Sequence, residues 1–188
     1  MKIALFGGSF DPPHIGHYRI ISKCLFICDK LVIMPTKISP HKSNFPIASN
    51  QDRINMLEMI CSEFNGRVII DHYELNSKNI PSYTIDAMNY VMEQYLPTKL
   101  YLVLGKDQYV NFKNWKSYEN ILSNTTIICV DRPGVNGDLD FKCIFIDDVD
   151  CEISSSGIRS SMVNNVELVK QYVSSDIFNY IRDKGLYI

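Results

Sequence analysis

Two histidines three residues apart, His14 and His17, end a glycine-rich loop near the beginning of the chain. Residues 7–17 read Gly-Gly-Ser-Phe-Asp-Pro-Pro-His-Ile-Gly-His. Glycines let backbone N–H groups approach an anion, and histidines three apart share one face of a helix. Two imidazoles beside the positive N-terminal end of a helix suit a phosphate group under attack. The stretch therefore predicts a phosphate site.

The neighbouring segments indicate how this loop is held. An apolar run predicts a strand over residues 2–6, and apolar residues at helical spacing predict a helix over residues 16–29. Asp11-Pro12-Pro13 delays the helix, because the residue before a proline avoids the α region. Open α/β sheets bind phosphate ligands at such a corner between strand and helix.

Strands and helices alternate along the rest of the chain. Further strands are expected at 31–34, 67–71, 100–104, 125–130 and 143–146, helices at about 50–64 and 83–95, and an extended polar segment at 72–82. This order predicts an α/β fold with a mostly parallel sheet covered on both faces and a helical C-terminal region. The length fits a single domain over residues 1–188.

The loops that carry chemically useful residues all follow predicted strands. They are residues 7–17, 35–42, 105–115 and 132–134, and a serine-rich stretch follows the last strand. Because the carboxyl ends of parallel strands meet at one edge of a sheet, we expect these loops to converge there. Ser154 and Ser155 predict a helix start with hydroxyl caps, and the guanidinium of Arg159 can bond two phosphate oxygens.

Four other residues are candidates for substrate contacts. Gly105 would let a ligand approach the backbone, and Asp107 could accept hydrogen bonds from ribose or help hold a metal-bound phosphate. Trp115, the single tryptophan, could stack on a flat ring, although packing is its more ordinary role. Lys42 could bring a mobile positive charge, and a solvated lysine is an equally good interpretation.

The composition argues against several classes of partner. The 188 residues are 46% hydrophobic and 21% charged with a net charge of −2, so we expect no nucleic-acid partner. No apolar run approaches the roughly 20 residues that cross a membrane, and we expect no signal peptide. Six cysteines without Cys-x-x-Cys spacing predict reduced thiols, no metal site built from protein ligands, and a cytoplasmic location. The sequence leaves open whether the protein forms a homo-oligomer.

These motifs resemble those of the nucleotidyltransferase superfamily. Residues 14–17 match its His-x-Gly-His signature, and residues 153–159 are similar to its Ile-Ser-Ser-Thr-x-Ile-Arg signature. Over nearly its whole length the chain most resembles bacterial nicotinate-nucleotide adenylyltransferases. The similar stretches are residues 7–12, 82–84, Gly105-x-Asp107 with Trp115, 132–134 and 185–187. Lys106 and Ser156 depart from the family pattern.

The resemblance implies a Rossmann-like, doubly wound α/β fold and transfer of AMP from ATP to nicotinate mononucleotide, with Mg²⁺, to give deamido-NAD and pyrophosphate. It implies that His14, His17 and Arg159 are catalytic and hold the ATP phosphates. The other implied ATP contacts are Gly7, Gly8, Ser9, Phe10, Gly16, Gly105, Asp107, Arg132, Ile153, Ser154 and Ser155. The implied contacts of nicotinate mononucleotide are Lys42, Tyr83, Thr84 and Trp115.

Three alternatives share parts of this pattern. The first motif equally suits an adenylyltransferase for another phosphorylated acceptor, such as nicotinamide mononucleotide or phosphopantetheine. A fragment of a class I aminoacyl-tRNA synthetase shares the His-Ile-Gly-His corner, but this chain lacks a Lys-Met-Ser-Lys-Ser loop. A nucleotide sensor without catalysis would keep the glycines but would not need the paired histidines and Arg159.

Overall fold

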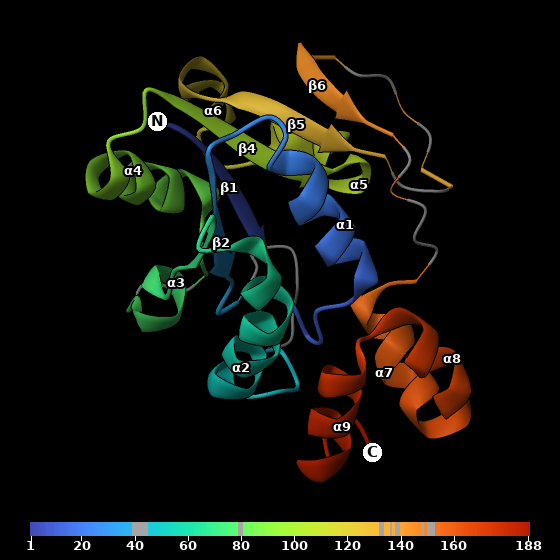
Figure 1. Cartoon of the computed structure of the whole chain (residues 1–188). Helices are drawn as coiled ribbons and strands as arrows, with labels where there is room; N and C mark the ends of the chain where they lie inside the picture. Colours follow the sequence, from blue (N-terminus) through green and yellow to red (C-terminus); the bar gives the residue numbers. More distant parts are fainter. Residues whose placement is uncertain are drawn as a thin grey trace.

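A six-stranded sheet forms the centre of the computed structural model (Figure 1). The model describes residues 1–38, 45–78, 81–131, 134–135, 137, 140–147, 149 and 153–188. The strands are β1 (Lys2–Gly8), β2 (Lys30–Pro35), β3 (Val68–Ile70), β4 (Lys99–Gly105), β5 (Thr126–Val130) and β6 (Cys143–Ile146). They pair in the order β3-β2-β1-β4-β5-β6, and every pair is parallel.

Helices cover both faces of the sheet. They are α1 (Ile15–Cys24), α2 (Asn50–Cys61), α3 (Tyr73–Asn76), α4 (Thr84–Tyr95), α5 (Lys106–Tyr109), α6 (Tyr118–Asn124), α7 (Ser155–Asn164), α8 (Val166–Tyr172) and α9 (Ser175–Asp183). Two 3₁₀ turns, Ser62–Phe64 and Phe112–Asn114, complete the described helical segments. Figure 1 shows α7, α8 and α9 grouped at one end of the molecule, as the predicted helical C-terminal region.

The strands are apolar along their whole length because both faces are buried. Alternate residues of β1 point to opposite faces: Ala4 and Phe6 pack with α1, α2 and the C-terminal helices. Ile3 and Leu5 pack with α4 and α6. Two separate apolar cores therefore hold the helices, which confirms the predicted doubly wound α/β architecture.

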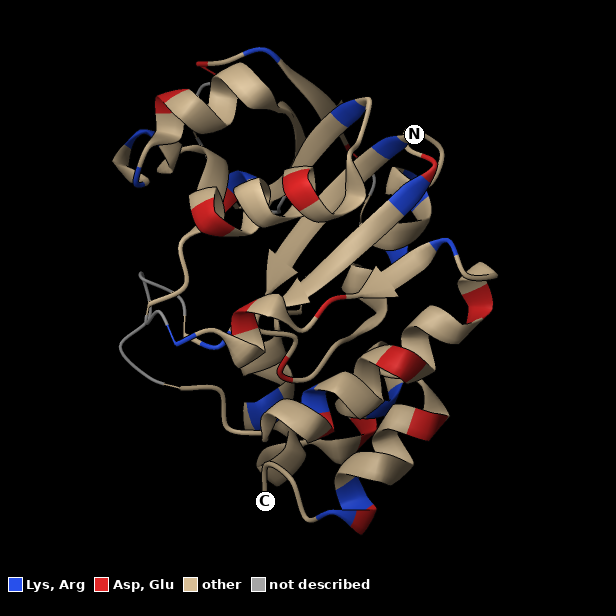
Figure 2. Ribbon diagram, turned by 90° about the vertical axis from the view of Figure 1, so that its left-hand side faces the viewer, with Lys and Arg blue, Asp and Glu red and all other residues tan. Residues whose placement is uncertain are grey.

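The strand order reverses beside β1, since β2 and β3 lie on one side of it and β4 to β6 on the other. In such sheets ligands bind at this switch point, outside the carboxyl ends of the strands. Three strands begin with a lysine, Lys2, Lys30 or Lys99. Figure 2 shows these blue segments where the arrows start, so this positive charge lies at the edge opposite the expected site.

Some local predictions were wrong. β1 continues to Gly8, so Gly7 and Gly8 end the strand, although the strand was expected to stop at residue 6. The first helix ends at Cys24 with Leu25 as its C-cap, although the apolar spacing predicted a helix as far as residue 29. Within the segment expected to be extended, residues 73–76 form the short helix α3. The Asp71 carboxylate holds this turn through two contacts. One oxygen accepts a local hydrogen bond from the Tyr73 amide at 2.8 Å, and the other accepts a long-range one from the Tyr95 hydroxyl of α4 at 2.6 Å.

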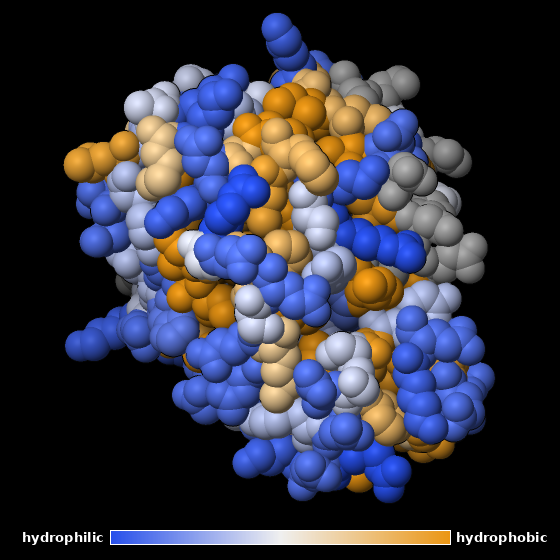
Figure 3. All heavy atoms as spheres, viewed as in Figure 1, coloured by the Kyte–Doolittle hydropathy of each residue, from blue (hydrophilic) through white to orange (hydrophobic). Residues whose placement is uncertain are grey.

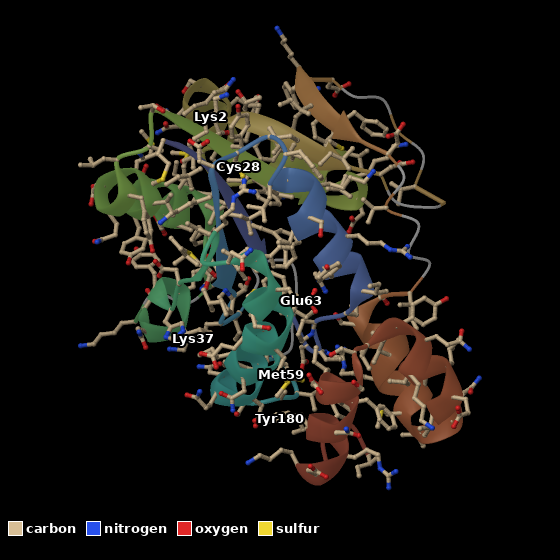
Figure 4. All side chains as sticks on the ribbon, in the orientation of Figure 1. Lys2, Cys28, Lys37, Met59, Glu63 and Tyr180 are labelled. Atoms are coloured by element: carbon tan, nitrogen blue, oxygen red, sulfur yellow. The ribbon has the colours of Figure 1, made fainter. Side chains whose placement is uncertain are left out.

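Polar contacts fix the C-terminal helices to α2. The Tyr180 hydroxyl of α9 donates to Asp52 and accepts from Asn55, both at 2.8 Å (Figure 4, where Tyr180 is labelled). The face shown in Figure 3 is mainly hydrophilic, with smaller hydrophobic areas between the polar groups. Among the described helices, none is long and apolar enough to cross a membrane.

The sheet centre generates a stability prediction. Ile33 is fully buried between the partners of β2, so Ile33→Ala should lower the free energy of unfolding by about 2–5 kcal/mol. Val163→Ala, at a position 69% exposed, should change it by less than about 0.5 kcal/mol. Urea titration followed by circular dichroism compares them, and equal effects would contradict the assigned core.

Candidate active site

A cavity of about 640 Å³ opens at the carboxyl edge of the sheet. The loops after β1, β2, β4 and β5 and the first residues of α1, α4 and α7 line it. Every predicted site residue in the described part of the chain lies on its wall: Gly7, Gly8, Ser9, Phe10, His14, Gly16, His17, Tyr83, Thr84, Gly105, Asp107, Trp115, Ile153, Ser154, Ser155 and Arg159. Lys42 and Arg132 lie outside the described residues.

The two histidines form the start of α1. His14 is its N-cap, and its Nδ1 accepts a hydrogen bond from the Gly16 amide at 3.2 Å. His17 Nδ1 accepts from the His14 amide at 3.2 Å, and the two rings lie 4.0 Å apart. Since Nδ1 is the acceptor in both, each neutral ring carries its proton on Nε2. Local backbone contacts thus orient both imidazoles as donors.

Packing in the first loop supports His17. The Phe10 ring is buried and lies 5.0 Å from the His17 ring and 5.4 Å from that of Phe6. A side chain at Gly8 would come within 3.0 Å of Phe10, whereas one at Gly7 would meet only Met34 O, at 4.0 Å. A side chain at Gly8 would therefore press on the buried Phe10 ring, whereas one at Gly7 would not be crowded.

The buried Asp11 carboxylate joins the first loop to three other segments of the chain. It is 2% exposed and accepts hydrogen bonds from the amides of Ile47 and Ala48, at 2.8 and 3.1 Å. The Tyr187 hydroxyl donates to it at 2.7 Å, and Arg159 lies 3.6 Å from its other oxygen. Burial and the Asp11 charge raise the pKa of Tyr187 above its usual range, so the hydroxyl stays a donor.

Helix α7 is joined directly to this first loop. The Arg159 guanidinium donates to the carbonyl of Asp11 at 2.6 Å, and the Ser155 hydroxyl donates to the carbonyl of Pro12 at 2.9 Å. Ser154 caps the helix by accepting from the Gly157 amide, as its sequence predicts. The N-terminal ends of α1 and α7 thus lie on the wall of one cavity.

Aromatic and basic groups line the cavity from the other face of the sheet. Tyr83 is the N-cap of α4 and makes no side-chain hydrogen bond to that helix. The ammonium of Lys116 lies 4.3 Å from the centre of the Tyr83 ring, and Trp115 packs 5.2 Å from Phe112. This wall combines flat apolar surfaces with positive charge and the start of α4.

The loop after β4 depends on a glycine for a different reason from the one expected. A side chain at Gly105 would come within 2.6 Å of the Asp107 carboxylate, so the glycine makes room for that group. Lys106, the departure noted in the sequence, forms an ion pair with Asp131 at 3.4 Å. Within the described ranges, no group of three or more His, Cys, Asp or Glu side chains could hold a metal ion.

Comparisons with known proteins agree with this geometry. A family model described as cytidylyltransferase-like matches residues 5–161. Proteins of Aliarcobacter butzleri and Borrelia garinii subsp. bavariensis, both named "Probable nicotinate-nucleotide adenylyltransferase", are each 32% identical, over 98% and 100% of this chain and 98% and 95% of theirs. The chain is a cytidylyltransferase-like protein of the nicotinate-nucleotide adenylyltransferase family.

Members of this family share the fold as well. The structure of Plasmodium falciparum nicotinic acid mononucleotide adenylyltransferase complexed with NaAD matches with a TM-score of 0.83 at 22% identity, over 99% of this chain and 97% of that one. The Rossmann-like fold and the nucleotidyltransferase class expected from the sequence are confirmed.

Sequence reasoning missed several residues of this adenylyltransferase site. The fully buried Arg53 of α2 donates to the carbonyls of Ser9 and Thr36, at 2.7 and 3.0 Å, and so holds two cavity loops. The roles of Asp11 in joining these segments and of Glu74 on the cavity wall were also missed. These contacts join distant segments, so no local spacing reveals them, and Arg53 stands among other polar residues of α2.

The contacts of the Asp11 carboxylate generate a prediction. Tyr187→Phe removes a buried hydrogen bond to a carboxylate and should lower the free energy of unfolding by about 1.5–3 kcal/mol, measured by urea titration. Tyr172→Phe is the matched control, since its half-buried hydroxyl bonds to none of the described residues. An equal, small effect of both substitutions would show that the contact adds no stability.

Proposed function

We propose that the chain transfers the AMP group of ATP to nicotinate mononucleotide, giving deamido-NAD and pyrophosphate in NAD biosynthesis. The observation that carries the proposal is the shared cavity: His14, His17 and Arg159 line it together with Tyr83 and Trp115, from opposite faces of the sheet. One wall suits a triphosphate and the other a flat, negatively charged ring. An adenylyltransferase must hold both substrates at once.

The reaction needs positioning more than proton transfer. The 5′-phosphate of a mononucleotide is mostly dianionic at neutral pH, since its second pKa is about 6. Its oxygen forms a bond to the α-phosphorus of ATP while the bond to the bridging oxygen of the β-phosphate breaks, and pyrophosphate leaves with that oxygen. No general base is needed. The main obstacle to the reaction is the electrostatic repulsion between the anionic 5′-phosphate and the triphosphate of ATP.

The phosphate wall supplies the compensating positive charge. His14 and His17 would donate from Nε2 to phosphate oxygens, and Arg159 would add a fixed cation. The N-termini of α1 and α7 direct backbone dipoles at the same region. Because these groups are held by packing and hydrogen bonds before the substrate arrives, little reorganisation opposes catalysis.

The other wall would take the pyridine nucleotide. Trp115 offers a flat face for the ring, and the start of α4 at Tyr83 and Thr84 offers backbone N–H groups to a carboxylate. Lys116 adds positive charge beside Tyr83. This combination supports an acidic pyridine rather than a neutral one as the acceptor.

Adenylyltransferases use ATP, generally with a divalent metal ion. We propose Mg²⁺, which keeps several waters and binds through one or two carboxylates together with substrate phosphates. Asp107 is a carboxylate on the cavity wall and fits such a metal arriving with ATP. When bound, the metal would neutralise charge on the triphosphate. A cytoplasmic location and a homo-oligomer stay predictions.

A pyrophosphate-release assay tests the function. Purified protein with ATP and Mg²⁺ should turn over nicotinate mononucleotide faster than nicotinamide mononucleotide or phosphopantetheine, because one cavity wall is basic and aromatic. Chromatography should identify deamido-NAD as the second product. Preference for phosphopantetheine, or ATP binding without pyrophosphate release, would overturn the proposal.

His17 provides a test of the phosphate wall. His17→Ala should lower kcat by about 10²–10³-fold, as the loss of one preorganised stabiliser does. His72→Ala, an exposed histidine of the same chain, should keep wild-type turnover. Thermal unfolding of both variants checks that they fold, and near-normal kcat in folded His17→Ala would remove this ring from the chemistry.

A further inference from the structure

One group on the cavity wall has no role in the mechanism above. Glu74 of α3 lines the cavity although its side chain is largely covered, since the residue is only 7% exposed. Its Oε2 is buried and has no hydrogen-bond partner among the described residues. The Ser82 hydroxyl is also buried and lies near this carboxyl, but its oxygen makes no hydrogen bond of good geometry within that part of the chain. Two buried polar groups are thus unsatisfied in the unliganded site.

Unsatisfied buried groups are costly, because a hydrogen bond to water is lost and none replaces it. A ligand that supplies the missing partner recovers that cost on binding. Glu74 and Ser82 line the cavity with Tyr83, Thr84 and Trp115, on the wall proposed for the pyridine ring. The missing partner is therefore expected on the pyridine nucleotide and not on ATP.

The surroundings of Glu74 favour its neutral form. Burial raises the pKa of this carboxyl to about 7, the charge of Asp86 on α4 also raises it, and the nearby Ser82 hydroxyl lowers it. Two ammonium groups of this region are engaged elsewhere: Lys37 donates to the Ser77 carbonyl at 3.1 Å, and Lys116 lies over the Tyr83 ring (Lys37 is labelled in Figure 4). Both protonation states are therefore accessible near neutral pH.

We propose that Glu74 is a specificity-determining residue, which distinguishes a carboxylate from a carboxamide on the pyridine ring of the acceptor mononucleotide. The inference rests on the proposed function. As a neutral acid, Glu74 donates an O–H···O⁻ hydrogen bond to the nicotinate carboxylate, with the Ser82 hydroxyl as a second donor. As an anion, it repels that carboxylate and accepts an N–H from the amide of nicotinamide mononucleotide instead.

This assignment makes acceptor selectivity depend on pH. The measured quantity is the kcat/KM for nicotinate mononucleotide divided by that for nicotinamide mononucleotide, from pH 6 to 8 at fixed ATP and Mg²⁺. Both acceptors carry the same 5′-phosphate and meet the same histidines, so those titrations cancel in the ratio. The nicotinate carboxylate stays ionised throughout, which leaves Glu74 as the group that changes the ratio.

With a pKa of about 7, the neutral fraction of Glu74 falls from ~0.9 at pH 6 to ~0.1 at pH 8, so the ratio should fall by at least about tenfold. Glu74→Gln stays neutral and can donate from its amide, so its ratio should not change with pH. Glu93→Gln, an exposed carboxyl of α4, should keep the wild-type pH dependence.

Calorimetry gives a second measurement without turnover. At pH 8, binding of nicotinate mononucleotide to the wild type should take up close to one proton more than binding of the amide, because Glu74 must be protonated. This difference is obtained from binding enthalpies in buffers of different ionisation enthalpy. It should disappear in Glu74→Gln.

The outcomes separate the two proposals. The inference is overturned if the wild type turns over both acceptors with a kcat/KM ratio that does not change with pH. It is also overturned if Glu74→Gln lowers kcat/KM equally for both acceptors at every pH, because Glu74 would then have a purely structural role. Absence of pyrophosphate release with either mononucleotide at every pH would instead overturn the proposed function.

Discussion

The burial of one negative charge organises the phosphate side of the cavity. A carboxylate as covered as that of Asp11 is stable only where hydrogen-bond donors and a cation surround it. Its partners come from the segment before α2, from α7 and from the last residues of the chain. Satisfying this one group therefore forces segments that are up to 176 residues apart to meet beside the first loop.

The same constraint shapes the electrostatics of the site. Arg159 is held by the carbonyl and the carboxylate of Asp11, which fixes its direction and offsets part of its charge. The histidines are fixed separately, by amides of their own helix. The positive field at the cavity is thus distributed over several rigid groups, which suits a substrate whose charge is spread over three phosphates.

Much of this could be predicted from the sequence because the informative features are local. His14 and His17 lie within one helical turn, and Ser154 precedes the helix that it caps. Their convergence follows from a rule of parallel sheets that needs only the strand order. Asp11 and Arg53 could not be assigned in this way, since their partners are distant in the chain and any acidic or basic surface residue would look the same. The helix α3 was missed in part for the same reason, since the Tyr95 hydroxyl that bonds to Asp71 belongs to α4, 24 residues further along the chain.

The attachment of α9 to α2 through Tyr180 has a consequence for the whole C-terminal segment. Among the described residues, hydrogen bonds attach helices α7 to α9 to the rest of the molecule in two places, one at Tyr180 and one at Asp11 and Pro12. A nucleotide that forms hydrogen bonds with both α1 and α7 would add a third connection between this segment and the rest of the molecule. Ligand occupancy and docking of this segment are then thermodynamically coupled, so each strengthens the other by the same free energy.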